Sequence, residues 1–346
     1  MKDNELIVKY YVALETILSK NGINPLKTNL NWIKNNVEPT QFIVDNLIAK
    51  NSINFLGGKT GTGKSTLAMQ LAFSLALGCD FLGWKTNFDG TVIYSDFELQ
   101  PGVLVKRHQI QMNNNLKNLK IITKSACEDK PLFRFDDDLI NALKEIGSMK
   151  DIFGELFLIL DNITYSGIAI SKNEDALEFI NKLHDLQKNY DYTILVLGHM
   201  SKSIPKTQPM ELEYVLGSTT LLGAFSLILG LGASNNNKNS RYLKVLKNSF
   251  GESGQVYDLM LTADIGKFSF YNLGECSEAK HLEIEAHFDG YLQALSLLDE
   301  SGLTRAELKK LIVSKFKVSS KTAYNRIDKL IAEKKIYLKN GKYFRK

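Results

Sequence analysis

Residues 58–65, which read GKTGTGKS, have the residue types and spacing of a phosphate-binding loop. The pattern is G-x-x-x-x-G-K-[ST], in which glycines let backbone amides wrap a phosphate chain. We expect Lys64 to reach the β- and γ-phosphates of ATP and the Ser65 hydroxyl to bind Mg²⁺. The predicted nucleotide-binding residues are Gly58, Lys59, Thr60, Gly61, Thr62, Gly63, Lys64, Ser65 and Thr66. The alternative interpretation is a glycine-rich turn that only precedes a helix.

A second metal ligand is expected at Asp161, which follows five apolar residues, LFLIL. An ionised carboxylate in such a place is costly unless it is paired or lies near a metal ion. The predicted metal ligands are therefore Ser65 and Asp161. The alternative role for Asp161 is to cap the next turn.

Hydrolysis also needs a carboxylate that polarises the attacking water. Many ATPases with this loop place a Glu directly after the metal-site Asp, but Asn162 stands there. Asp96 and Glu98 follow the apolar segment 91–95, and alternation past the end of a strand directs both toward the edge where ligands sit in open α/β sheets. We favour Glu98 as the catalytic base. A surface role for Glu98 is the alternative.

Alternating apolar strands and helices must position these residues. The strand candidates are 53–56, 91–95, 156–160, 193–197, 226–231 and 242–246. The helix candidates are 64–77, 101–113, 136–146 and 173–189. This order predicts an α/β fold with a mostly parallel, twisted sheet, extended at one edge by antiparallel strands.

The chain is predicted to have four parts: a helix over 4–20 with a linker to residue 40, an α/β domain over 41–274, a polar linker over 275–285, and a small domain over 286–346. The last part holds 14 Lys and Arg against 6 Asp and Glu, a net charge of +8. A basic module indicates a nucleic-acid partner, and a solvated lysine-rich surface is the alternative.

Within 286–346 the pattern predicts three helices and a basic hairpin. Helix candidates cover 287–300, 305–316 and 320–334; Thr304 and Glu307 form a capping box, and Asn340-Gly341 predicts a type I′ turn. This arrangement resembles a winged helix-turn-helix whose third helix enters the major groove of duplex DNA. The predicted DNA contacts there are Lys321, Asn325, Arg326, Lys329 and Lys342. Contact with another protein is the alternative.

Composition excludes several classes of protein. With 44% hydrophobic and 23% charged residues, the chain is neither collagenous nor wholly disordered. Its three widely separated cysteines form no disulfide framework or zinc motif, which favours a reducing compartment, the cytoplasm. No apolar run is long enough for a membrane span, and the N-terminus does not read as a secretory signal.

Taken together, GKTGTGKST, VIYSDFELQPG, LFLILDN, ILVLGHMSK and LKVLKNSFG resemble the RecA-like P-loop ATPases. The nearest branch by resemblance is the plasmid RepA-type hexameric helicases, related to DnaB-like replicative helicases. The resemblance spans about residues 40–272. It implies ATP and Mg²⁺ as ligands, a homo-hexameric ring and single-stranded DNA as partner.

The resemblance also assigns roles to residues. Glu98 corresponds to the catalytic glutamate and His199 to a γ-phosphate sensor, although a histidine after a strand is often structural. Lys202 and Lys206 fall in a DNA-facing loop over 201–217. Lys247 corresponds to a basic residue that enters a neighbour's ATP site. In the family that the chain resembles, an arginine commonly stands two positions after this lysine, where this chain has Ser249. Arg241 is therefore another candidate for the residue that acts between subunits.

The sequence therefore predicts an ATPase that is a DNA-dependent motor, a ring-forming replicative-type DNA helicase of a plasmid or mobile element. The alternative is a RecA-like switch or loader that binds DNA through its winged helix without unwinding it. A small-molecule kinase is disfavoured because neither a site for a phosphate acceptor nor a lid segment can be recognised in the sequence.

Overall fold

The computed structural model describes residues 2–28, 30–99, 101–108, 116–123, 134–168, 173–201, 208–215, 219–264, 267–282, 294–298, 301–316 and 318–346. The chain divides into two compact units, Met1–Gln41 and Phe42–Lys346. The first unit contains the helices α1 (Lys2–Lys20), η1 (Pro25–Thr28) and α2 (Leu30–Asn36). The helix predicted over 4–20 is α1, and Gly22 follows it with φ +75°.

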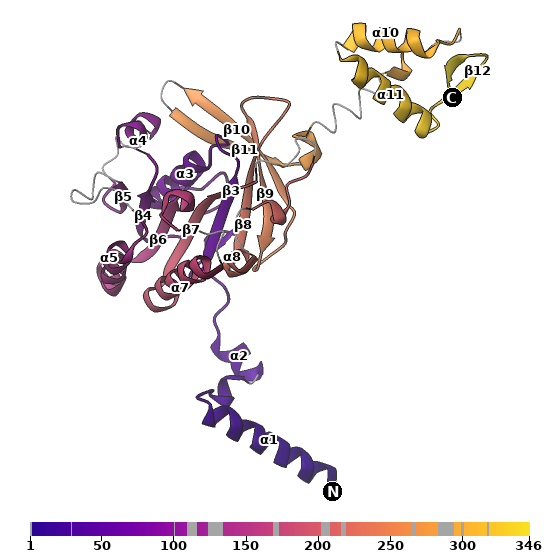
Figure 1. The fold of residues 1–346 in the computed structure, drawn as a ribbon. Helices are drawn as coiled ribbons and strands as arrows, with labels where there is room; N and C mark the ends of the chain where they lie inside the picture. The colour runs from indigo at the N-terminus through magenta and orange to yellow at the C-terminus, as the bar shows by residue number, and fades with distance from the viewer. Residues whose placement is uncertain are drawn as a thin grey trace. The chain divides into compact units, whose positions relative to one another are not determined.

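The second unit is built on a sheet of nine described strands in the order β11-β10-β9-β8-β3-β7-β6-β4-β5 (Figure 1). The parallel part contains β3 (Ile53–Gly58), β4 (Gly90–Asp96), β5 (Leu119–Thr123), β6 (Glu155–Asp161), β7 (Tyr192–His199) and β8 (Leu227–Ala233). The antiparallel edge contains β9 (Ser240–Asn248), β10 (Val256–Asp264) and β11 (Lys267–Glu275). The predicted α/β fold, mostly parallel with antiparallel strands at one edge, is confirmed.

Helices cover both faces of the sheet, which explains why its central strands are continuously apolar. The helix α3 (Lys64–Leu77) buries Leu67 and Leu71 on one face, in the same cluster as Leu56. On the other face, Phe55 shares a cluster with residues of α5 (Asp137–Ser148), α7 (Asn173–Tyr190) and α8 (Thr219–Ala224). Successive residues of β3 thus pack against opposite layers.

The remaining elements of this part are short. They are β1 (Phe42–Val44), β2 (Ile48–Ala49), α4 (Pro101–His108), α6 (Lys150–Phe153), and the 3-10 turns η4 (Ile163–Tyr165), η5 (Leu212–Tyr214) and η6 (Glu278–Lys280). The helix predicted over 101–113 is seen as α4, and residues 109–115 lie outside the described ranges. In α5 the helix begins one residue later than predicted, because Asp136 is its N-cap and accepts from the Leu139 amide at 3.1 Å.

The C-terminal residues have a hydrophobic cluster of their own. The helices α10 (Arg305–Phe316) and α11 (Ser320–Ala332) pack with the hairpin of β12 (Ile336–Lys339) and β13 (Lys342–Arg345). The predicted capping box is present, since the Glu307 carboxylate accepts from the Thr304 amide at 2.9 Å and Thr304 Oγ1 accepts from the Glu307 amide at 3.3 Å. Asn340 and Gly341 both have positive φ, as a type I′ turn requires. Most of the helix predicted over 287–300 lies outside the described residues.

Candidate ATP site

The loop between β3 and α3 takes a conformation that only its glycines permit. Gly61 and Gly63 have φ of +79° and +102°, a region that residues with a Cβ rarely enter. A Cβ on Gly58 would lie 2.6 Å from the Leu231 carbonyl oxygen. Thr62 Oγ1 closes the loop by donating to the Lys59 carbonyl at 2.9 Å. The predicted phosphate-binding loop therefore ends at the N-terminus of α3, where backbone amides favour an anion.

Lys64 is the first residue of α3 and is buried. Its Nζ donates to the carbonyl oxygens of Gly58 at 2.9 Å and Lys59 at 3.2 Å. Burial lowers the pKa of Lys64, while the charges of Asp161 and Glu98 act in the opposite direction. The ammonium group is thus held inside the loop by backbone carbonyls and faces two carboxylates.

A cavity of about 360 Å³ opens beside this loop, a volume within the range of small-ligand sites. Four parallel strands meet at its edge, because β3, β4, β6 and β7 all end there. Its lining residues are Thr60, Gly61, Gly63, Lys64, Ser65, Thr66, Glu98, Leu99, Asp161, Asn162, His199 and Leu261. The topology therefore gathers the predicted loop, base, metal ligand and sensor into one cavity.

Asp161 ends β6 and is 2% exposed. Tyr94 Oη donates to Asp161 Oδ2 at 2.6 Å. Burial, followed by the negative charge of Asp96, raises the pKa of Asp161 to about 6, although hydrogen bonds from Tyr94 and Ser65 oppose the shift. A divalent cation would offset this buried negative charge, and Ser65 and Asp161 offer the oxygen ligands that such a cation prefers. The residues present therefore fit a metal ion.

Asp96 and Glu98 occupy different environments, although alternation predicts that they share one side. Asp96 is buried, and its Oδ1 accepts from the backbone amides of Glu98 at 2.9 Å and Leu99 at 2.8 Å. Glu98 is exposed to the cavity and accepts from Asn162 Nδ2 at 2.8 Å. Asp96 thus holds the turn that presents Glu98, and only Glu98 lines the cavity.

Asn162 has a positional role that the sequence pattern does not reveal. Its Oδ1 accepts from the Thr164 amide at 3.0 Å, so its side-chain amide is fixed while Nδ2 donates to Glu98. The residue that replaces the common glutamate after Asp161 therefore orients the glutamate of the neighbouring strand. Only the strand register could have identified this role of Asn162. Because β4 and β6 pair Asp96 with Asp161, the residues that follow these two aspartates come close to one another.

His199 ends β7 and pairs in register with Gly58, which places it at the cavity as predicted. Lys202 and Lys206 lie outside the described residues, as do 202–207 and 216–218 of the predicted DNA-facing loop.

Lys247 lies near the opposite end of the sheet from its own phosphate-binding loop. In the sheet, Gly58 of β3 pairs with Leu231 of β8, which pairs with Leu243 of β9. Lys247 lies four residues beyond Leu243, which is roughly 13 Å along the strand. Its Nζ donates to the carbonyl oxygens of Leu222 and Gly223, both at 3.2 Å. Burial lowers the pKa of Lys247. The cavity of the same chain is not lined by Lys247.

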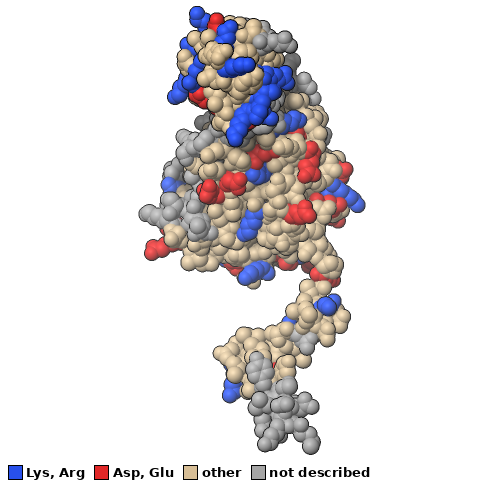
Figure 2. All heavy atoms as spheres, turned by 90° about the vertical axis from the view of Figure 1, so that its right-hand side faces the viewer, with Lys and Arg blue, Asp and Glu red and all other residues tan. Residues whose placement is uncertain are grey.

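The predicted DNA face of the C-terminal module is mostly exposed. Lys321, Asn325 and Lys329 recur every four residues along α11 and are exposed, as is Lys342 in the hairpin. Figure 2 shows Lys and Arg side chains gathered on this module. Arg326 differs, because its guanidinium packs over the Phe316 ring at 5.6 Å and is partly buried. This packing gives Arg326 a structural contact within the module.

A family model described as an AAA domain matches residues 21–204, more than half of the chain. No curated protein matches the chain. A solved DnaB-like replicative helicase, described with its interactions with primase, is 12% identical with a TM-score of 0.52; the match covers 70% of this chain and 65% of the helicase chain, just under two thirds of its length. This similarity confirms the predicted RecA-like fold.

Two further solved structures are similar at lower scores. The RadB recombinase is 16% identical, with a TM-score of 0.43 and coverage of 62% of this chain and 89% of the recombinase. A KaiC-like protein from Pyrococcus horikoshii OT3 is 14% identical, with a TM-score of 0.45 and coverage of 67% of this chain and 100% of the KaiC-like chain.

Among the described residues, no helix is long and apolar enough to cross a membrane.

Proposed function

This chain belongs to the AAA-domain family and is a P-loop ATPase of RecA-like fold, and we propose that it is a DNA-dependent motor, a ring-forming helicase of the plasmid RepA-type branch. The observation that supports the proposal most is the single cavity that holds Lys64, Asp161, Glu98 and His199 at the carboxyl edge of the sheet.

We assign ATP binding to the loop over 58–66 and charge neutralisation to Lys64. The Nζ of Lys64 donates to two loop carbonyls, so it must exchange these bonds for phosphate oxygens when ATP enters. Backbone amides at the start of α3 complete the anion site. Ser65 and Asp161 are the residues that would hold Mg²⁺, which would neutralise charge on the β- and γ-phosphates.

Glu98 is the proposed general base. Its carboxylate lines the cavity, and the hydrogen bond from Asn162 Nδ2 at 2.8 Å fixes its direction. A base must lie within hydrogen-bond reach of the water it activates, and Glu98 is the exposed carboxylate of the lining set, whereas Asp161 is buried. His199 pairs in register with Gly58 and precedes 201–217 in the chain, so it is suited to sense the γ-phosphate and to transmit its loss to that segment.

DNA contact is proposed at two places. Lys202 and Lys206 are proposed to contact single-stranded DNA in the ring. The exposed row of Lys321, Asn325 and Lys329 is proposed to contact duplex DNA, with two helices and a basic hairpin forming a winged helix-turn-helix. The support for DNA contact is an analogy, the fold shared with a replicative helicase.

The helicase reading is tested by measuring ATP hydrolysis and strand displacement in parallel, each with and without single-stranded DNA. We expect single-stranded DNA to raise turnover, and displacement of a labelled strand to require hydrolysable ATP. Lys64→Ala is the control for displacement by contaminating enzymes. Stimulated hydrolysis without displacement would support the switch or loader instead. Turnover that single-stranded DNA does not change, with no strand displacement, would contradict the helicase.

Assembly is tested through Lys247. Because Lys247 lies far from its own loop, Lys247→Ala should bind ATP nearly as the wild type does, while hydrolysis falls because a neighbour's site loses charge stabilisation. When Lys247→Ala and Glu98→Gln subunits are mixed, some interfaces pair an intact Glu98 with an intact Lys247, so part of the activity should return. The measurement is the turnover of the mixture as a function of the ratio of the two variants.

Two controls accompany the mixing experiment. Lys188→Ala removes an exposed lysine on α7 and should leave turnover unchanged. Pull-down of one variant through an affinity tag must recover the untagged other variant, which shows that the two assemble together, and light scattering measures the size of the assembly. A co-assembled mixture that is as inactive as each variant alone would refute shared sites, and a monomer with full turnover on ATP·Mg²⁺ and single-stranded DNA would refute the ring.

A further inference from the structure

The guanidinium of Arg241 contacts the phosphate-binding loop of its own chain. Arg241 is the second residue of β9, and its Nε donates to the Thr62 carbonyl oxygen at 3.0 Å. Its Nη1 donates to the carbonyl oxygens of Lys238 at 2.7 Å and Ser240 at 2.9 Å. These three bonds hold the partly buried guanidinium in one orientation. A side chain 179 positions away in sequence is thus bound to the loop that wraps the phosphates.

The bond acts on the peptide unit between Thr62 and Gly63. In a planar trans peptide, the C=O and the following N–H point in opposite directions. A donor that holds the Thr62 carbonyl outside the loop therefore turns the Gly63 N–H toward the other side, and Gly63 lines the cavity. Gly63 has φ +102°, where glycine has unusual freedom to rotate, so an external restraint has a large effect on this peptide.

Two further restraints on the loop come from its own residues Thr62 and Lys64. The Lys59 carbonyl accepts from Thr62 Oγ1, and the carbonyls of Gly58 and Lys59 accept from Lys64 Nζ. The Lys64 bonds must break when its ammonium moves to the phosphates. The bond from Arg241 does not compete with the nucleotide, because it approaches the loop from β9.

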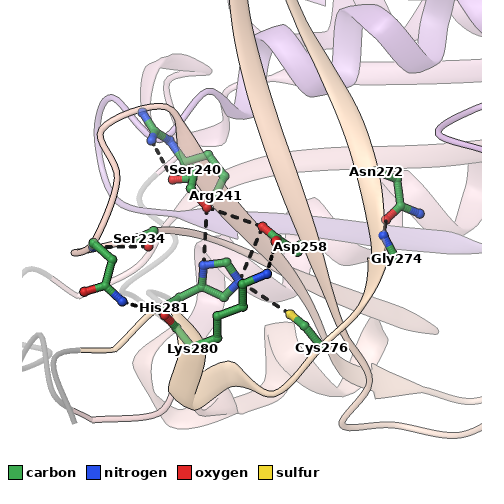
Figure 3. A network of polar contacts seen from close by, with 10 residues as sticks. Ser234, Ser240, Arg241, Asp258, Asn272, Gly274, Cys276, Lys280 and His281 are labelled. Carbon is green, nitrogen blue, oxygen red and sulfur yellow. Dashed lines mark hydrogen bonds and ion pairs between the residues drawn. The ribbon is translucent and has the colours of Figure 1, made fainter. Parts of the chain in front are cut away.

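The start of β9 is a firm support for this contact. Ser240, next to Arg241, is buried and donates to Asp258 Oδ1 at 3.3 Å, in a cluster with His281. Tyr242, on the other side, stacks on the His281 ring with 5.0 Å between centroids. Figure 3 shows Ser240 turned toward Asp258 and His281, whereas the Arg241 side chain leads away from them. Strand pairing with both β8 and β10 completes the support.

We propose that Arg241 is a positioning residue for the phosphate-binding loop, acting within its own subunit by holding the Thr62–Gly63 peptide in the orientation that receives phosphate. The inference deepens the proposed ATP site and rests on it. It differs from the role that the sequence leaves open for Arg241, in which the guanidinium completes a neighbour's site. A positioning role alters nucleotide affinity, whereas a role in a neighbour's site alters turnover.

The test measures ADP binding by titration calorimetry and ATP turnover at saturation, using the full chain. For Arg241→Ala we expect the Kd for ADP to rise about 10- to 100-fold, the effect of losing one charge-assisted hydrogen bond, with kcat changed less than about threefold. Arg241→Lys keeps the charge without the planar Nε donor and should restore only part of the affinity. Lys238→Ala is the matched control: it removes a nearby positive charge but leaves the backbone carbonyl that Arg241 contacts, so the Kd should not change.

Thermal unfolding without nucleotide establishes whether the variants fold. If Arg241→Ala does not fold, Arg241→Gln, which keeps a neutral donor on a shorter side chain, decides the question with the same measurements. An unchanged Kd overturns the inference, and so does a fall in kcat at unchanged Kd. Failure of the ATP site itself is distinguishable, because then the wild type does not bind ADP or Lys64→Ala binds it equally well.

Discussion

Lys64→Ala is expected to abolish ATP hydrolysis and to weaken nucleotide binding by about 10- to 100-fold. The estimate for binding corresponds to the loss of a hydrogen bond to a charged group, about 1.5–3 kcal/mol. The effect on the rate is expected to be larger, because a positioned donor to the developing charge contributes about 10²–10³ in kcat. Titration calorimetry with ATP·Mg²⁺ and a steady-state turnover assay measure the two effects separately.

The environment of Lys64 explains why a neutral residue cannot substitute for it. The ammonium faces Asp161 and Glu98, whose charges oppose the fall in its pKa that burial causes. Its removal leaves the buried Asp161 carboxylate without that neighbouring positive charge. Lys120→Ala, which removes an exposed lysine on β5, is the control for net charge. Unchanged affinity and turnover in Lys64→Ala would refute the ATP site.

Glu98→Gln is expected to keep ATP binding and to lower the rate of hydrolysis by about 10²–10⁴, the usual contribution of a general base. Glutamine has the size of glutamate, and its Oε1 can still accept from Asn162 Nδ2, so the side chain should stay in place. The measurement is single-turnover hydrolysis with the variant saturated with ATP, so that binding and chemistry are separated.

Asp96→Asn is the matched control for Glu98→Gln. Asparagine retains the oxygen that accepts from the Glu98 and Leu99 amides, so the turn should persist and hydrolysis should be largely retained. Loss of the Asp96 charge should also bring the pKa of Asp161 down from about 6 toward its ordinary value. If Asp96→Asn is inactive and Glu98→Gln turns over normally, the assignment of the base is wrong.

The sequence by itself determined the local features of this protein. The phosphate-binding loop, the helix over 64–77 and the central strands could be predicted from residue types and from periodicity over short stretches of sequence. The capping box at Thr304 and Glu307 and the turn at Asn340-Gly341 are also local, and the structure contains both. The sequence reasoning missed β1, β2, β5, β10 and β11. Of these, β5, β10 and β11 mix polar with apolar residues and lie at or near the edges of the sheet.

Tertiary structure alone decided which side chains meet. Asp96 and Glu98 are two residues apart, yet Asn162, which directly follows β6, donates to Glu98, whereas Asp96 accepts from backbone amides of its own turn. Arg241 and Lys247 lie on one strand, but the antiparallel direction of β9 puts Arg241 at the phosphate-binding loop and Lys247 toward the far end. Such contacts depend on strand order and register, which join residues far apart in sequence and leave no short-range pattern in the chain.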